Sequence, residues 1–107
     1  MTPESIREGE NNSGELVLHG EPFEVATCIA TRVQETTLGN LTIHGDRQSA
    51  KIEMVPTLDL GHVGGYVVDL VSAGNGQTRT NYYVIRWAPD VQKRLQRMRS
   101  LIQECAT

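Results

Sequence analysis

Alternation of apolar and polar residues with a period of two constrains the fold of this chain more than any other feature of its sequence. The pattern recurs in six short segments, at residues 16–19, 23–33, 41–43, 50–54, 66–71 and 82–87. Successive side chains of a β-strand point to opposite faces of a sheet, so this period indicates strands with one buried face. The sequence therefore predicts six β-strands.

Turn-forming residues separate these segments. They lie at His19 to Pro22, Gly39-Asn40, Gly45-Asp46, Gly61 to Gly65 and Gly74 to Gly76. Strands joined by such short connections are expected to pair antiparallel, because a parallel crossover needs a dozen or more residues. Six short strands around one small core are expected to close into a β-barrel, which removes exposed edges.

The period changes from two to that of an α-helix near Pro89. The apolar residues that follow have helical spacing: Val91, Leu95, Met98, Ile102 and Cys105. They predict a C-terminal helix from about residue 89 to 105 with one apolar stripe. The stripe is expected to pack on the protein's own sheet or barrel mouth, and pairing with the same helix of a second copy stays open as the alternative.

A chain of 107 residues is long enough for one domain with one modest core. Residues 1–13 contain Ile6 as their only large aliphatic side chain besides Met1, so they are predicted to be a flexible tail before a single domain at 14–107. The acidic start has no apolar stretch typical of a secretory signal, and no segment is long enough to span a membrane, so a cytoplasmic location is expected.

Charge is distributed unevenly along the chain, although the net charge is only −3. The first 24 residues hold six glutamates and one arginine. The region from residue 79 onward holds six cations, namely Arg79, Arg86, Lys93, Arg94, Arg97 and Arg99. Two solvated faces of opposite charge explain this pattern, and contact between the basic region and an anionic partner is the alternative.

The residues that could carry chemistry favour a protein without catalytic activity. Residues 14–21 and 39–46 share a Gly-x-Leu-x-aliphatic-His-Gly-acid pattern, which is typical of a strand-ending turn; a metal shared by His19 and His44 is the alternative. Cys28 and Cys105 have no Cys-x-x-Cys partner and are predicted to be small buried hydrophobic residues. No spacing indicates paired carboxylates or an activated nucleophile, so neither an enzyme nor a cofactor or metal site is expected.

Two segments resemble PilZ domains. Residues 35–43 are similar to the Asp/Asn-x-Ser-x-x-Gly element of that family, with Glu35, Thr37 and Asn40 at its three defining positions. Residues 83–87 and the helix from about Pro89 resemble its last strand and closing helix. The resemblance covers roughly residues 14–106 and implies a six-stranded barrel with a C-terminal helix, a fold that binds cyclic di-GMP in many members.

The resemblance is to a degenerate PilZ domain, because all three defining positions carry substitutes. In addition, Arg7 is followed four places later by Asn11, where the family's Arg-x-x-x-Arg element has a second arginine. Two guanidinium groups grip phosphates and guanine edges bidentately, and one does not. The resemblance therefore implies a regulatory signalling domain that no longer binds the nucleotide.

The function expected from the sequence is that of a non-catalytic PilZ-like adaptor that contacts another protein, as a monomer or a homodimer. The candidate contact residues are Tyr82, Arg86, Arg94 and Arg97, and the helix stripe at Val91, Leu95, Met98 and Ile102 is the candidate core or dimer surface. One alternative is a nucleotide-sensing module in which cyclic di-GMP is held by Arg7, Arg32, Glu35, Thr37 and Asn40. A further alternative is a nucleic-acid-binding small barrel that uses the basic C-terminal region, although the acidic net charge and 5% aromatic content count against it.

Overall fold

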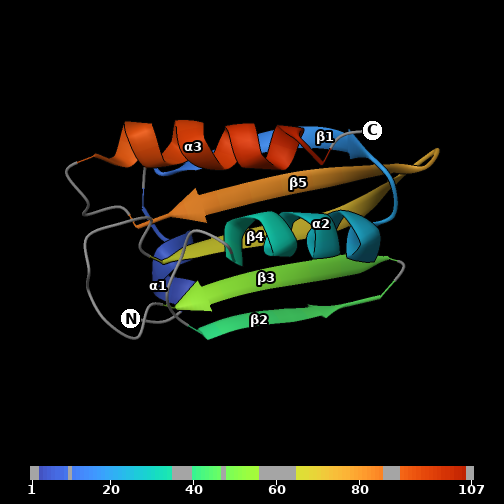
Figure 1. Ribbon diagram of the computed structural model, residues 1–107, viewed down its shortest axis with the longest axis horizontal. Coiled ribbons are helices and arrows are strands. Elements are labelled where there is room, and N and C mark those ends of the chain that lie inside the picture. Colours follow the sequence, from blue (N-terminus) through green and yellow to red (C-terminus); the bar gives the residue numbers. More distant parts are fainter. Residues whose placement is uncertain are drawn as a thin grey trace.

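An antiparallel β-sheet with helices packed on both of its faces forms the body of the protein (Figure 1). The computed structural model describes residues 3–9, 11–34, 40–46, 48–55, 65–85 and 90–105. Along these parts of the chain the elements are α1 (Pro3–Arg7), β1 (Ser13–His19), α2 (Pro22–Gln34), β2 (Asn40–Gly45), β3 (Ser49–Val55), β4 (Tyr66–Gly74), β5 (Gln77–Val84) and α3 (Val91–Gln103). The mixed β+α class and the C-terminal helix predicted from the sequence are confirmed. None of these helices is long and apolar enough to cross a membrane.

The strands follow the order β1-β5-β4-β3-β2 across the sheet, and every neighbouring pair is antiparallel. β1 and β2 therefore lie at opposite edges, and the sheet is open. The prediction of a six-stranded barrel is wrong, because the described residues form five strands and the two edge strands do not meet. The cause is α2, which carries the chain from β1 across one face of the sheet to the far edge, so that β1 and β2 cannot form a hairpin (Figure 1).

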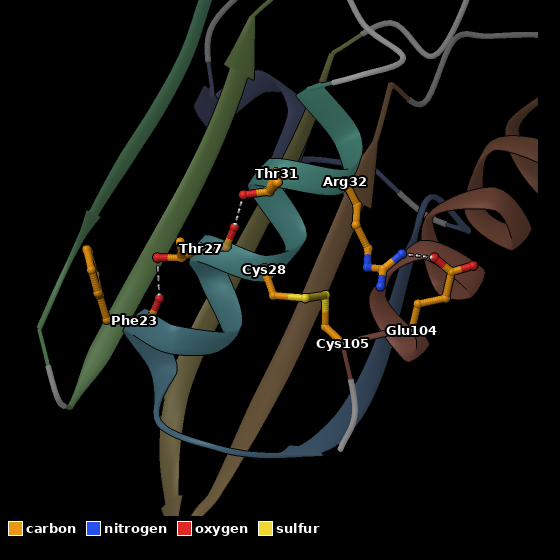
Figure 2. Close-up of a disulfide and its surroundings, with 7 residues drawn as sticks. All are labelled: Phe23, Thr27, Cys28, Thr31, Arg32, Glu104 and Cys105. Atoms are coloured by element: carbon orange, nitrogen blue, oxygen red, sulfur yellow. Dashed lines mark hydrogen bonds and ion pairs between the residues drawn. A yellow bond between two sulfur atoms is a disulfide. The ribbon is translucent and has the colours of Figure 1, made fainter.

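Residues 23–33, predicted as the longest strand, form most of α2. The segment satisfies two periods at once, because its β-branched residues alternate while a second set of small and apolar residues repeats at helical spacing. This second set is buried: Val25, Ala26, Ile29, Ala30 and Val33. The exposed hydroxyls of Thr27 and Thr31 donate to the carbonyl oxygens of Phe23 and Thr27 at 2.9 and 2.8 Å (Figure 2). Burial of the helical set outweighs the strand propensity of the alternating one.

Two hairpins, β2–β3 and β4–β5, supply four of the strands. In the first turn, the N–H groups of Gln48 and Ser49 donate to Asp46 Oδ1 at 2.8 and 3.0 Å, and these bonds hold the pKa of Asp46 below its ordinary value. In the second turn, residues 74–76 have φ values of 81°, 56° and 73°, a conformation that the Gly-Asn-Gly sequence tolerates. β5 begins at Gln77, well before the predicted segment 82–87, because it pairs with β1 and β4 along its whole length.

The inner face of the sheet, beneath α2 and α3, holds the main core. α2 lies over β2, β3 and β4, and α3 lies over β1 and β5 (Figure 1). The strands contribute Leu18, Ala50, Ile52, Met54, Tyr66, Val68, Leu70, Tyr82 and Val84 to this core. Met98 and Ile102 of α3 are fully buried, and Val91 and Leu95 pack against the same core. The apolar stripe of α3 therefore covers the protein's own sheet.

The outer face of the sheet carries α1, within the segment 1–13 that composition predicts to be a flexible tail. Ile6 is fully buried and forms a second cluster with Val67 and Ile85, which point away from the main core. The buried Asn12 side chain donates to the carbonyl oxygen of Ile6 at 3.1 Å. Ile6 is the apolar anchor of this segment, because Val67 of β4 and Ile85 just after β5 present apolar side chains on the outer face.

A disulfide bond joins Cys28 in α2 to Cys105 just after α3, with the two Cα atoms 5.9 Å apart (Figure 2). The prediction that these are separate hydrophobic residues is wrong. The two cysteines are 77 positions apart, so no local spacing could indicate the bond, and only the packing of α2 beside α3 brings them together. Next to the disulfide, Arg32 Nη1 donates to Glu104 Oε2 at 2.7 Å, which makes a second link between the same two helices (Figure 2).

Candidate interaction surface

The residues that the PilZ resemblance assigns to a nucleotide do not gather at one place in the described structure. Arg32 is exposed on α2 and bound to Glu104, whereas Arg7 lies on α1. Because α1 and α2 cover opposite faces, the sheet separates the two arginines. Asn40 is the first residue of β2, and Glu35 and Thr37 lie outside the described residues.

The predicted contact residues also occupy different environments. Tyr82 is buried on the inner face, where its ring lies so close to Gly14 that a Cβ at that position would overlap it. Arg94 is partly buried and its Nε donates to Asp90 Oδ1 at 2.7 Å, a bond that lowers the pKa of Asp90. Arg97 is exposed on α3, and Arg86 lies outside the described residues. The buried Tyr82 therefore cannot serve as an interaction anchor.

The two histidines of the repeated pattern lie on opposite edges of the sheet. His19 ends β1 and His44 lies near the end of β2, with three strands between them, so they cannot share a metal ion. In the part of the chain that the structure describes, no three His, Cys, Asp or Glu side chains are grouped closely enough to hold one. The two copies of the repeated sequence form different structures. The first copy leads into α2, and the second forms the β2–β3 turn.

An ion network on the outer face fixes α1. Arg7 Nε and Nη2 donate to Asp69 Oδ2 and Oδ1 at 2.9 and 2.8 Å, the bidentate geometry that a guanidinium favours with a carboxylate. Arg7 Nη2 also lies 3.4 Å from Glu53 Oε2, and His44 Nε2 lies 3.8 Å from Glu53 Oε1. The hydrogen bond to Asp69 raises the pKa of Arg7 above its ordinary value. Sequence reasoning missed this network because its members are 46 and 62 positions apart.

The half of the outer face that α1 leaves uncovered carries two exposed valines on either side of an arginine. Val17 of β1 and Val71 of β4 are both partners of Arg79 on β5, so the three side chains form one row across three strands. Val17 and Val71 are 52% and 51% exposed. Glu15 Oε1 lies 3.9 Å from Arg79 Nε. We call these four residues the outer patch.

The outer patch could have been located from the sequence in part. The alternation in residues 16–19 and 66–71 places Val17 and Val71 on the faces opposite Leu18 and Leu70, and both leucines are buried in the main core. The alternation does not indicate that the two valines lie in one row across the sheet. They do so only because β5 lies between β1 and β4.

The fold and these surfaces define the protein as a small β+α domain with an open antiparallel sheet and an exposed, mixed apolar and charged patch on it. A scan against models of known protein families finds no match to the chain, and a search of curated proteins finds no match either.

Proposed function

We infer that the protein is a non-catalytic interaction domain that contacts another protein through the outer patch. The observation that carries this proposal is the row of Val17, Arg79 and Val71 on the uncovered half of the sheet. Exposed apolar side chains gathered around an arginine are typical of surfaces that bind proteins, where arginine is among the residues that contribute most energy.

The chemistry of the patch defines the kind of partner. Burying the exposed half of each valine stabilises a complex by about 1 kcal/mol. Arg79 Nε lies 3.9 Å from Glu15 Oε1, which is too far for a strong hydrogen bond. A carboxylate of the partner that lies closer to the guanidinium can therefore take the place of Glu15. The partner surface therefore has a carboxylate at its centre, opposite Arg79, and apolar groups on either side, opposite Val17 and Val71.

The adaptor role suggested by the PilZ resemblance is retained as part of this proposal, and it does not require the barrel. Cyclic di-GMP receives no support from the arginines, since Arg7 and Arg32 lie on opposite faces and each has a carboxylate partner. A nucleic-acid ligand receives little support, because Arg94 of the basic C-terminal region is already bonded to Asp90. Both ligands stay as predictions, tested by calorimetry with cyclic di-GMP and by retention on heparin.

Capture of a partner by the immobilised protein, with matched variants, tests the proposal. Arg79→Glu and Val71→Lys are expected to lose a partner that the wild type captures. Phe23→Lys is the control, because Phe23 is 48% exposed and lies on α2, on the other face of the sheet. A partner captured equally by wild type and Arg79→Glu contradicts the proposal, and so does tight binding of cyclic di-GMP.

The location of the protein belongs to the same proposal. Disulfides form and persist in oxidising compartments and are rare in the cytosol, so the Cys28–Cys105 bond weighs against the cytoplasmic location expected from the sequence. Alkylation of thiols during rapid cell lysis decides between the two: protection of both cysteines favours an oxidising compartment, and modification of both favours the cytosol.

A further inference from the structure

Among the described residues β1 lies at one edge of the sheet, and the backbone groups that it does not share with β5 can be assigned residue by residue. The carbonyl oxygen of Asn12 accepts from the N–H of Val84 at 2.9 Å, and the N–H of Gly20 donates to the carbonyl oxygen of Gly76 at 2.7 Å. Along an antiparallel pair, the residues that bond to the neighbouring strand alternate with residues whose groups point away. The backbone groups of the even-numbered residues from 12 to 20 therefore point to β5. The N–H and C=O groups of the odd-numbered residues point to the open edge; these residues are Ser13, Glu15, Val17 and His19.

The open edge lacks three of the features that often block strand addition. Exposed edge strands in natural proteins usually carry proline, lysine or a bulge, because a bare edge pairs with other chains. β1 reads Ser-Gly-Glu-Leu-Val-Leu-His, with no proline or lysine, and it pairs with β5 in unbroken register from Ser13 to His19. Such an edge is suited to pairing with a further strand.

We propose that a second copy of the protein pairs with β1 antiparallel to it, with a two-fold axis at Val17. The two sheets then form one continuous sheet across the dimer. In this register Val17 is hydrogen-bonded to Val17 of the second copy, and Glu15 of each copy lies opposite His19 of the other. The proposal rests on the edge of β1 and not on the proposed function.

The side chains select this register among those that a two-fold axis allows. An axis at Glu15 places two glutamates opposite each other, and like charges directly opposite each other are destabilising. An axis at Leu18 places Val17 opposite His19 and leaves Glu15 without a partner, because β1 ends at His19. An axis at Leu16 places Glu15 opposite the apolar Val17. Of these axes, only the one at Val17 places a carboxylate opposite an imidazole, which can donate a hydrogen bond to it, and it does so twice.

The register with the axis at Val17 brings apolar side chains opposite each other on both faces of the sheet. On the outer face, the axis joins the two exposed valines, so the rows of Val71, Arg79 and Val17 from both copies form one surface. On the inner face, Leu16 of one copy lies opposite Leu18 of the other, and both belong to or pack against the main core. The dimer thus places apolar groups opposite apolar groups on each face.

Sedimentation velocity from about 1 µM to about 1 mM, the range of weak to moderate association, measures the assembly. The wild type is expected to move from 11.8 kDa toward twice that mass. Val17→Lys places two lysines opposite each other and should weaken association at least about tenfold. Phe23→Lys is the matched control, because Phe23 is 48% exposed, similar to Val17, but lies on α2 and not on the open edge, and it should associate like the wild type.

Charge exchange tests the register. Glu15→Lys is expected to weaken the dimer, and Glu15→Lys combined with His19→Glu is expected to restore it, while circular dichroism confirms that each variant is folded. A monomer at every concentration overturns the proposal, as does a dimer that survives Val17→Lys or one that the exchange does not restore. A strand of another protein on the open edge would give the first of these results. The partner-capture experiment with Arg79→Glu is read separately, so loss of the dimer does not decide the proposed function.

Discussion

Removal of the disulfide is the perturbation whose cost can be estimated most directly from the structure. The bond closes a loop between Cys28 and Cys105 that spans 77 positions, most of the chain. In the chain-entropy model a loop of this length restricts the unfolded ensemble by about 4.5 kcal/mol. Domains of this size are stable by about 5 to 15 kcal/mol, so the bond accounts for a large share of the total.

The folded state should change little when the bond is removed. α3 stays on the sheet through Met98 and Ile102, which are fully buried, and the Arg32–Glu104 ion pair still links it to α2. The loss therefore acts mainly on the unfolded chain. We expect the Cys28→Ala and Cys105→Ala double variant to keep the far-ultraviolet spectrum of the wild type and to unfold at a temperature about 20 °C lower.

Urea unfolding of four samples measures this loss: wild type and the double variant, each with and without reductant. Oxidised wild type is expected to exceed the other three by about 4 kcal/mol in free energy of unfolding, and those three should agree with one another. A difference below about 1 kcal/mol, with full reduction verified by thiol titration, would refute the chain-entropy reasoning. Two free thiols in the untreated wild type would refute the pairing itself.

Two further predictions concern the outer face and the first hairpin. Arg7→Ala should lower the free energy of unfolding by about 2 kcal/mol, because it leaves the part-buried carboxylate of Asp69 without its bidentate partner; chemical denaturation measures this, and a loss no greater than that of the exposed-site control Arg97→Ala would contradict it. The pKa of Asp46 in the folded protein should lie below the ordinary value of an aspartate, because the N–H groups of Ser49 and Gln48 donate to its carboxylate, and NMR titration measures this. Since its folded pKa is lowered, its stabilising effect is present above the unfolded pKa and is lost as the pH falls through the folded pKa; Asp46→Asn should remove that part of the acid dependence.

The sequence predicted the features that depend on neighbours along the chain. β3 and β4 follow from alternation, the Asp46 turn from its residues, and α3 from a stripe of unambiguous helical spacing. Residues 23–33 show the limit of such reasoning. Their β-branched residues favour a strand, and whether Ala26 and Ala30 make a helix more stable depends on a sheet being present to cover. The error in this one segment also led to the barrel, because a strand there would have joined β1 to β2.

The candidate site depended on distant residues and was therefore mostly beyond local patterns. The members of the outer patch become neighbours only because β5 lies between β1 and β4, and the Arg7 network and the disulfide join residues from different parts of the chain. The residues proposed from the PilZ resemblance were chosen by position in a motif. A motif does not determine which face of the sheet a residue will occupy, and the structure places Arg7 and Arg32 on different faces.

The packing of α1 on the outer face, which the sequence analysis did not predict, was nevertheless implied by the sequence of β4. Tyr66, Val67 and Val68 are three successive apolar residues, so β4 presents apolar side chains on both faces of the sheet at this point. All three are fully buried, and Ile6 of α1 covers Val67. A segment with a single large aliphatic residue lacks the composition of a core element, but it needs to supply only one side chain when the sheet already presents an apolar site. Composition alone therefore underestimates the order of a short segment that lies next to a strand of this kind.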